Sequence, residues 1–448
     1  MEGSGNKDQV LVLGGGISGL ATSWFLHNAG VPFTLIEKDS KAGGVISSSN
    51  IEGTIVDYGP NSLRDKDGEL RALANEVGLE DDLIRISEAF KTRYIVRDRE
   101  LQELAPSPKT LFTTKVLSTK GKLRVLAEPF ISSGTAEDES VGAFLERRIG
   151  KEAVDYLVDP VFSGIYAGDI YRISKKEILP GLAENEQMFG SLVMGTLRSK
   201  KEKSEVKPLV LSFKKGVQQL AEAIESKLKD HICYEEVIGI NKEVAGFKVQ
   251  TDKKEYQASH VISCLPAHTL PSLLGNFETS LRETLEQIRY SPMLSTQLIF
   301  RKEEIDFKKS GFGFLIPRAE NIRLLGAIWK TSIFPELSDE GHFHFTLMTG
   351  GAHDASVLNE PTDKVEKDIL NEFSQITGIK QDPMYIRSVL WEKAIPQFHV
   401  GYQSIRQRLI DHESQNSGLH FGGNYRWGVS VPDCIKGAKT LVQKTFKL

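Results

Sequence analysis

The sequence lacks the features that mark disulfide-rich, metal-binding or membrane-spanning proteins. Its three cysteines, Cys233, Cys264 and Cys434, are too few and too far apart for a disulfide framework or a metal-ligand cluster, which favours a reducing cytoplasm. No run of about 18 uncharged apolar residues is present, so no transmembrane helix is expected. The first residues, MEGSGNKDQ, are polar and are not expected to act as a secretory leader. We therefore expect a cytoplasmic protein without a metal site.

The sequence also has no excess of charge of one sign. Its 56 Lys and Arg residues nearly balance 60 Asp and Glu residues, giving a net charge of −4. This balance excludes a general affinity for nucleic acid. With 448 residues, 40% hydrophobic and 26% charged, the composition is that of an ordinary globular chain of two or three domains.

The most informative stretch is Gln9 to Glu37, which reads QVLVLGGGISGLATSWFLHNAGVPFTLIE. An apolar run predicts a buried strand, and the G-x-G-x-x-G of Gly14, Gly16 and Gly19 opens a predicted helix. These glycines allow a tight turn, close approach of a pyrophosphate, and close packing of helix on strand. Glu37 ends the second predicted strand, where a carboxylate binds ribose hydroxyls and disfavours a 2′-phosphate. The stretch therefore predicts a site for FAD or NAD.

A second glycine pair distinguishes this sequence from a plain NAD dehydrogenase. Gly43-Gly44 follows the acid within a few residues, and IVDYGPNS follows at 55–62. This order resembles the flavin amine-oxidase superfamily, in which such a pair lies along the FAD pyrophosphate. The resemblance implies that the Gly59-Pro60 turn approaches the flavin ring.

Two further stretches narrow the resemblance. DPVFSGIYAGD at 159–169 is similar to the S-G-[VI]-[YF]-A-G-[DN] signature of the protoporphyrinogen oxidase family, including its relatives that oxidise coproporphyrinogen. GGNYRWGVSVPDCI at 422–435 is similar to the family's C-terminal flavin segment. The resemblance covers nearly the whole chain, from Gly14 to Ile435.

This resemblance implies FAD as the cofactor. Val237 matches a position at the adenine end of FAD, and Trp391 matches a position beside the flavin. Asn61 stands where the family often has another residue, so the contacts at the mouth of the site stay open. The residues implied at the cofactor are Gly14, Gly15, Gly16, Ile17, Ser18, Gly19, Glu37, Lys38, Gly44, Val45, Gly59, Pro60, Asn61, Ser62, Val237, Trp391, Asn424, Val429, Ser430 and Val431.

The resemblance also implies a substrate site. Arg93 matches an Arg that pairs with a substrate propionate, a role that suits a forked guanidinium, although a solvated surface Arg is the alternative. Gly164 matches a glycine whose bare backbone lines the cavity. Leu315, Ile328 and Met348 match residues that sandwich the macrocycle, although by composition alone they read as core.

The implied reaction is the FAD- and oxygen-dependent oxidation of a porphyrinogen in haem biosynthesis, with H2O2 release. Hydride leaves a methylene bridge for flavin N5, and three turns remove six electrons. The sequence does not decide whether the substrate is protoporphyrinogen IX or coproporphyrinogen III. The two differ in their number of carboxylates, so a second well-placed cation, from Lys91, Arg64 or Arg97, would favour coproporphyrinogen III. No side chain is a convincing general base, and His268 reads as structural. Hand-over of the product to the next haem-pathway enzyme is a further expectation.

Two other readings stay open at this point. One is another flavin oxidoreductase, either an amine oxidase, which needs an aromatic cage, or a polyene desaturase, which has little use for Arg93. The other is a flavin-bearing protein with a degenerate site that binds a membrane or a partner without catalysis.

The predicted fold class is α/β, with a Rossmann-type FAD-binding domain, a mixed-sheet substrate domain and an inserted helical membrane-binding domain. Alternating runs after Met293 predict antiparallel strands of the substrate sheet. The basic, partly apolar segment Leu104–Phe130 suits an interface with anionic lipid or a surface helix covering a pocket. The predicted limits are 1–90, 208–290 and 411–448 for the FAD-binding domain, 91–207 for the helical insertion with part of the substrate domain, and 291–410 for the substrate domain.

Overall fold

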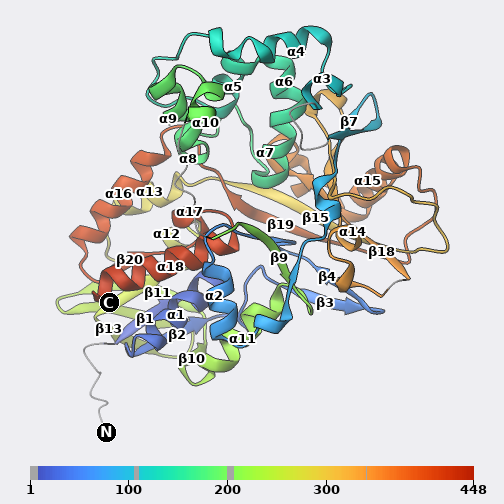
Figure 1. Ribbon diagram of the computed structural model, residues 1–448. Helices are drawn as coiled ribbons and strands as arrows, with labels where there is room; N and C mark the ends of the chain where they lie inside the picture. The colour runs from blue at the N-terminus through green and yellow to red at the C-terminus, as the bar shows by residue number, and fades with distance from the viewer. Residues whose placement is uncertain (1–8, 105–109, 199–205, 340, 448) are drawn as a thin grey trace.

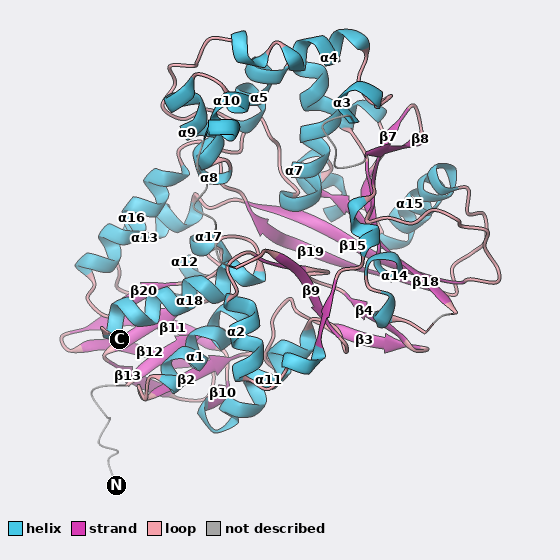
Figure 2. Cartoon of the chain, in the orientation of Figure 1, coloured by secondary structure: helices cyan, strands magenta, loops and turns pink. Residues whose placement is uncertain are grey.

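The elements of the chain gather in three groups, shown in Figures 1 and 2. The computed structural model describes residues 9–104, 110–198, 206–339 and 341–447. A parallel sheet with its helices forms the first group, a large mixed sheet forms the second, and the helices α3 to α10 lie together as the third. Part of the predicted basic segment, residues 105–109, lies outside the described residues.

The parallel sheet confirms the predicted Rossmann-type arrangement. Its strand order is β10-β2-β1-β14-β20, with every pair parallel. The central strand β1 is fully buried, and the chain leaves it toward β2 on one side and returns to β14 on the other. A crevice at such a switch point, beyond the carboxyl ends of the strands, is where nucleotides bind. The strands are β1 (Val10–Leu13), β2 (Phe33–Glu37), β10 (Ile232–Tyr234), β14 (His260–Ser263) and β20 (Leu419–Phe421).

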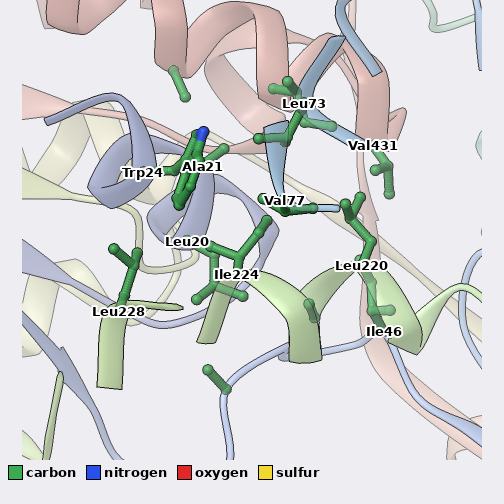
Figure 3. Packing of buried hydrophobic residues seen from close by; sticks show 14 of the residues in the cluster. Leu20, Ala21, Trp24, Ile46, Leu73, Val77, Leu220, Ile224, Leu228 and Val431 are labelled. Carbon is green, nitrogen blue, oxygen red and sulfur yellow. The ribbon is translucent and has the colours of Figure 1, made fainter. Parts of the chain in front are cut away.

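Apolar side chains cover both faces of this sheet. On one face Leu20, Ile224 and Val431 belong to a continuous buried cluster, part of which is shown in Figure 3. These residues lie on three helices drawn from distant parts of the chain, so the layer closes only when all three have formed. The elements on this face are α1 (Ile17–Asn28), α2 (Glu69–Glu76), α11 (Gln218–Leu228) and α18 (Val431–Phe446). Those of the other face are β11 (Val237–Glu243), β12 (Gly246–Thr251), β13 (Glu255–Ala258), α12 (Leu270–Leu273), α13 (Thr279–Glu286) and α16 (Tyr402–Gln415).

The mixed sheet has two faces of different character. Its order is β19-β15-β18-β17-β16-β7-β8, antiparallel except between β16 and β7. One face buries aromatic residues such as Phe314 and Phe345 against Phe373 of α15 (Thr362–Thr377). The strands are β7 (Arg93–Arg97), β8 (Glu100–Leu104), β15 (Tyr290–Arg301), β16 (Gly313–Leu315), β17 (Leu324–Trp329), β18 (His342–Gly350) and β19 (Tyr385–Pro396). The antiparallel strands predicted after Met293 are thereby confirmed.

The helical group has charged side chains in its interior. Arg148 is completely buried and is held by the carboxylate of Glu128 and by the carbonyl of Ile131, the latter at 2.7 Å. No described helix is long and apolar enough to cross a bilayer. The helices are α3 (Thr110–Thr113), α4 (Thr119–Leu126), α5 (Val141–Ile149), α6 (Lys151–Ala153), α7 (Asp159–Tyr166), α8 (Lys175–Ile178), α9 (Pro180–Phe189) and α10 (Leu192–Arg198).

The domain limits stay predictions. The limit placed at residue 410 falls within the unbroken helix α16. Strands β7 and β8, which lie within 91–207, belong to the mixed sheet.

Two small sheets complete the fold. One pairs β3 (Ser48–Ile51) with β4 (Thr54–Asp57), and the other has the order β5 (Leu63–Asp65), β9 (Leu209–Phe213) and β6 (Leu83–Arg85).

A buried ion pair joins the nucleotide-binding group to the mixed sheet. Lys330 Nζ donates to Asp57 Oδ2 at 3.0 Å and to the Asn61 carbonyl at 2.6 Å, and both charged side chains are buried. Asp57 Oδ1 accepts from the Val217 amide at 2.9 Å, at the start of α11. Thr346 Oγ1 on β18 donates to Asn61 Oδ1 at 3.0 Å. The segment at 57–61 is thus fixed from both sides.

We expect Lys330→Met to lower the free energy of unfolding by about 3–5 kcal/mol, because the Asp57 charge is then buried without its partner. Urea denaturation followed by tryptophan fluorescence measures this loss. The control is Lys41→Met, which breaks an exposed pair with Glu222 and should cost less than about 1 kcal/mol. Equal losses of unfolding free energy in the two variants would contradict the assignment of Lys330 and Asp57 as a buried, stabilising ion pair.

Candidate cofactor and substrate site

The first glycine turn has the geometry that a dinucleotide needs. Gly14 has a φ of 94°, and a Cβ on Gly19 would lie 1.8 Å from the Gly14 carbonyl oxygen, so neither position accepts a side chain. Gly16 differs, because a Cβ there would meet nothing within 4 Å. Gly16 precedes α1 and provides no side-chain cap, so no capping side chain takes up the first N–H groups of this helix.

Glu37 lies against this turn at the carboxyl end of β2. Its Oε2 accepts from the Gly15 amide at 2.5 Å, and its Oε1 accepts from the Asp39 amide at 2.9 Å. A carboxylate has about four acceptor positions, so capacity for ribose hydroxyls remains. The neighbouring residue Lys38 is exposed. The Glu235 amide donates to the Glu37 carbonyl at 2.8 Å, and Val237, two residues after Glu235, begins β11.

The second glycine pair folds onto the first turn. The Gly43 amide donates to the Gly15 carbonyl at 2.9 Å, and a Cβ on Gly44 would lie 3.2 Å from the Gly16 Cα. A Cβ on Gly59 would lie 2.0 Å from the carbonyl oxygen of Val45, whose side chain is 51% exposed. Three segments predicted at the cofactor are therefore in contact, with an apolar side chain left open beside them.

The C-terminal segment brings a second helix start to the same place. Ser430 Oγ accepts from the Asp433 amide at 3.2 Å and caps α18. Val431 in the first turn of α18 lies in one buried cluster with Leu20 of α1, and Ile17, the first residue of α1, packs against that cluster. The N-termini of both helices therefore meet beside the glycine turns, where their dipoles favour negative charge. The predicted residues Asn424 and Val429 are half-buried just before this cap.

Trp391 lies at the turn predicted to approach the flavin. Its Nε1 donates to the carbonyl of Tyr58 at 3.2 Å, directly before the Gly59-Pro60 turn. Pro60 and Ser62 are half-buried, and Asn61 is engaged by Lys330 and Thr346 as described above. The role of Asn61 is therefore partly structural, a point that the sequence left open.

These residues fit FAD by chemistry as well as by position. The uncapped start of α1 and the space before Gly16 suit a pyrophosphate, and the Glu37 carboxylate suits a ribose. The described residues contain no group of three or more His, Cys, Asp or Glu that could hold a metal ion.

Three residues predicted to contact the substrate share one face of the mixed sheet. Leu315 pairs with Gly326, which pairs with Met348. Gly313, two residues before Leu315 on the same face, pairs with Ile328. All three predicted side chains are half-buried, whereas their neighbours facing α15 are buried. An apolar face is therefore left partly open.

Helix α7 covers one end of this face. A Cβ on Gly164 would lie 2.8 Å from Leu315 Cδ2, so the bare backbone of the helix lies against the sheet. Val161 and Ile165 of the same helix are 38% and 52% exposed. The structure thus places Gly164 and Leu315 together, with exposed apolar side chains beside them.

Arg93 stands on the same face as these apolar residues. It lies two residues before Ile95, which pairs with Leu315. Its side chain is exposed, its guanidinium lies 5.8 Å from the ring of Phe312, and it forms no ion pair with any described residue. Two of the three alternative cations are engaged: Lys91 pairs with Glu88, and Arg97 stacks over Tyr156 at 3.7 Å. The third, Arg64, is exposed on β5 and, like Arg93, forms no ion pair with a described residue. Arg93 is thus a cation available to an anionic ligand.

The remaining reactive side chains lie in structural positions, His268 and Cys264 half-buried and Cys434 buried. His268 packs edge-on against Tyr290, and burial, together with Lys393, lowers the pKa of His268. Burial raises the pKa values of Cys264 and Cys434 to about 12, so both thiols stay protonated. The interpretation of His268 as a structural residue agrees with this packing.

Sequence reasoning missed two groups of this region. Asp57 stands in the quoted run IVDYGPNS, and Lys330 follows a predicted strand, but nothing local indicates that they pair. Asp159 opens the quoted stretch DPVFSGIYAGD without an assigned role. It is buried, and its Oδ1 has no hydrogen-bond partner among the residues that the structure describes.

Comparisons with known proteins agree with this geometry. The sequence profile described as flavin containing amine oxidoreductase matches residues 17–444. Protoporphyrinogen oxidase 2, chloroplastic/mitochondrial, of Arabidopsis thaliana is 29% identical, over 95% of this chain and 91% of that protein. Coproporphyrinogen III oxidase of Bacillus subtilis (strain 168) is 27% identical, over 98% of both.

A solved structure supports the fold. A protein of Exiguobacterium sp. 255-15, assigned by name as a protoporphyrinogen oxidase, superposes with a TM-score of 0.86 at 23% identity. The likeness covers 98% of this chain and 99% of that one. The predicted α/β architecture is therefore confirmed.

We expect Gly16→Ala to weaken FAD binding at least about tenfold while leaving the stability of the FAD-free protein unchanged. The new methyl group enters open space within the protein but occupies the side from which a pyrophosphate approaches. Quenching of flavin fluorescence on titration measures the affinity. Gly19→Ala is the matched comparison, because its methyl group collides with the Gly14 carbonyl and should destabilise the FAD-free protein. Unchanged FAD affinity in Gly16→Ala would refute the placement of the FAD pyrophosphate beside Gly16.

Proposed function

The chain belongs to the flavin-containing amine oxidoreductase family, and on that basis we propose that it uses FAD to oxidise a porphyrinogen. The proposed reaction is oxygen-dependent and converts protoporphyrinogen IX to protoporphyrin IX or coproporphyrinogen III to coproporphyrin III, with release of H2O2. It would place the protein in haem biosynthesis, ahead of an enzyme that receives the porphyrin.

The observation that carries this proposal is the substrate face itself. An amphipathic macrocycle with acidic arms requires a flat apolar slot and a cation at its edge. Leu315, Ile328 and Met348 form an apolar face, Gly164 brings bare backbone against it, and Arg93 stands on it without an ion pair among the described residues. Relatives named protoporphyrinogen oxidase and coproporphyrinogen III oxidase, each aligned over nearly the whole chain, support the same substrate class.

The protein contributes orientation and exclusion of water. FAD, when bound, supplies the acceptor for a hydride from a methylene bridge. Arg93 fixes a carboxylate arm through a bidentate contact, which limits rotation of the macrocycle in its plane. Apolar residues on the sheet face and on α7 exclude water from the reacting edge.

The main alternative is an amine oxidase or a polyene desaturase. An amine oxidase would hold its amine in an aromatic cage, whereas the described face is aliphatic around Leu315, Ile328 and Met348. A desaturase acting on an apolar polyene would gain nothing from the unpaired Arg93. Both alternatives would still yield a yellow, FAD-bearing protein, so only the substrate distinguishes them.

Arg93→Ala should raise KM for the porphyrinogen about 10- to 100-fold and change kcat less, because a charge-assisted contact contributes about 1.5–3 kcal/mol to binding. Steady-state turnover in the presence of oxygen gives both constants, and anaerobic bleaching of the flavin by protoporphyrinogen and coproporphyrinogen, measured in parallel, identifies the preferred substrate. Arg93→Lys keeps the charge but loses the fork, and an intermediate KM is expected.

Two outcomes would contradict different parts of the proposal. A yellow wild-type protein that neither porphyrinogen bleaches would refute the proposed reaction, and amines and polyenes would then be tested. Turnover of the porphyrinogen with the same KM in Arg93→Ala would keep the reaction and remove Arg93 as the anchor.

The helical group also supports a peripheral membrane contact. Phe112, Leu123 and Phe130 expose 63%, 63% and 88% of their surface, and Lys115 and Lys120 are exposed nearby. Apolar side chains beside cations bind the interface of an anionic bilayer. We place this contact on the cytoplasmic side of a membrane, in line with the compartment expected from the cysteines.

Changing Leu123 and Phe130 together to Ser should weaken binding to vesicles that contain anionic lipid several-fold without altering flavin content. Vesicle co-sedimentation at low and high salt measures the binding. The control is Leu358→Ser, which removes a 43% exposed leucine outside the helical group. Equal vesicle binding by all three proteins would exclude this surface.

A further inference from the structure

The proposed reaction requires a proton acceptor that the substrate face does not provide. A porphyrinogen loses six hydrogen atoms in becoming a porphyrin, four from its methylene bridges and two from its pyrrole nitrogens. Three leave as hydrides and carry all six electrons, so the other three must leave as protons. The side chains of Leu315, Ile328 and Met348 cannot accept them.

A polar cavity lies beside the helix that covers the substrate face. Its volume is about 240 Å³, and it lies between the helical group and the segment that follows β16. Its lining residues are Lys151, Asp155, Asp159, Tyr171, Arg318 and Ala319. The cavity is therefore large enough for several water molecules and is lined by groups that can hydrogen-bond to them.

Asp159 is the buried acid of this cavity. Its side chain is 7% exposed, and its Oδ1 is buried without a hydrogen-bond partner. The opposite oxygen, Oδ2, lies 3.8 Å from Arg318 Nε, a weak contact because Arg318 also faces Asp169 and is bonded to His353. A carboxylate oxygen buried without a donor is costly when charged. Burial accordingly raises the pKa of Asp159 to about 6, with Arg318 opposing the rise.

The cavity and the substrate face are built from the same two segments. Helix α7 begins with Asp159 and carries Gly164, about 7.5 Å further along its axis at 1.5 Å per residue. The segment after β16 carries Leu315, which touches Gly164, and then Arg318, which faces Asp159. Figure 1 shows α7 reaching from the helical group toward the mixed sheet. The cavity and the substrate face therefore lie at two neighbouring contacts between the same helix and the same segment, Asp159 with Arg318 and Gly164 with Leu315.

Resting on the porphyrinogen oxidation proposed above, we propose that the Asp159 carboxylate receives, through cavity water, the protons that leave the substrate and releases them to solvent. In each turn one C–H bond breaks with its electron pair going to the flavin, and one proton goes to Asp159. Each O2 then takes up two electrons and two protons to give H2O2, one proton from the hydride and one from solvent. Three turns balance the loss of six hydrogens.

The charged groups around Asp159 suit repeated protonation. Asp169 and Asp155 disfavour its charged form, whereas Arg318 and Lys151 favour it. His353 stays neutral beside Arg318, because burial and that cation lower its pKa to about 4. Tyr171 donates its hydroxyl to Glu146 at 2.8 Å and, with a raised pKa, takes no part as a base.

The test measures anaerobic flavin bleaching by the porphyrinogen between pH 5 and pH 8, in the FAD-loaded wild type and in Asp159→Asn. In the wild type the bleaching rate should rise about tenfold per pH unit below about 6 and level off above it, since the charged carboxylate is the acceptor. Asp159→Asn should lose this rise and bleach at least about tenfold more slowly. Formate, small enough for the cavity, should restore part of the rate in Asp159→Asn.

Asp155→Asn is the matched control, because it removes another carboxylate of the same cavity, one that is bonded to Lys151 at 2.8 Å. It should keep the rise, moved to lower pH, because the Asp155 charge that disfavours ionised Asp159 is removed. Infrared titration of the FAD-free wild type against Asp159→Asn gives a second readout, a carboxyl group that titrates near pH 6 only in the wild type. An unchanged pH profile in Asp159→Asn would overturn the proposal, whereas failure of both porphyrinogens to bleach the wild type would overturn the proposed function instead.

Discussion

A lysine ammonium buried away from water fixes how the two halves of the site stand relative to each other. Lys330 leaves the end of β17 in the mixed sheet, whereas Asp57 ends β4 beside the nucleotide-binding group. The ammonium also holds the carbonyl of Asn61, so the Gly59-Pro60 turn is fixed between two groups, the Asp57 carboxylate and the Asn61 carbonyl, that bind the same lysine. Because neither charge can move without losing the other, the turn expected at the flavin and the face expected at the substrate keep one geometry.

The sequence predicts well those parts of the site that depend on residues close in the chain. The strand, glycine turn, helix and acid of Gln9–Glu37 follow from local spacing, and the structure places Glu37 at the Gly15 amide as that spacing requires. Alternation of apolar residues likewise predicts the strands of the mixed sheet. Leu315, Ile328 and Met348 came from family resemblance alone, and the strand register gives that grouping a physical basis by placing all three on one face.

The contacts that escape prediction join residues far apart in the chain. Asp57 and Lys330 are 273 positions apart, and no local pattern distinguishes either from a surface charge. The same holds for Asp159, which reads as an ordinary helix-opening acid until Arg318, from the segment after β16, is seen beside it. The electrostatic environment of a side chain depends on what folds around it. Charge, burial and missing partners are therefore learned from the structure, whereas glycine turns and strands are learned from the chain.

The order in which the parallel sheet is assembled has a consequence for biosynthesis. β1 leaves the ribosome early, but its partner β14 follows at His260–Ser263, and α18, which packs on α1, begins only at Val431. The glycine turn therefore stays without its supporting strand and helix through most of translation. Such long-range pairing is slow and leaves apolar strands such as VLVL exposed to aggregation. The glycine turn therefore gains its complete support, β14 on one side and α18 against α1, only after Val431–Phe446 has been synthesised.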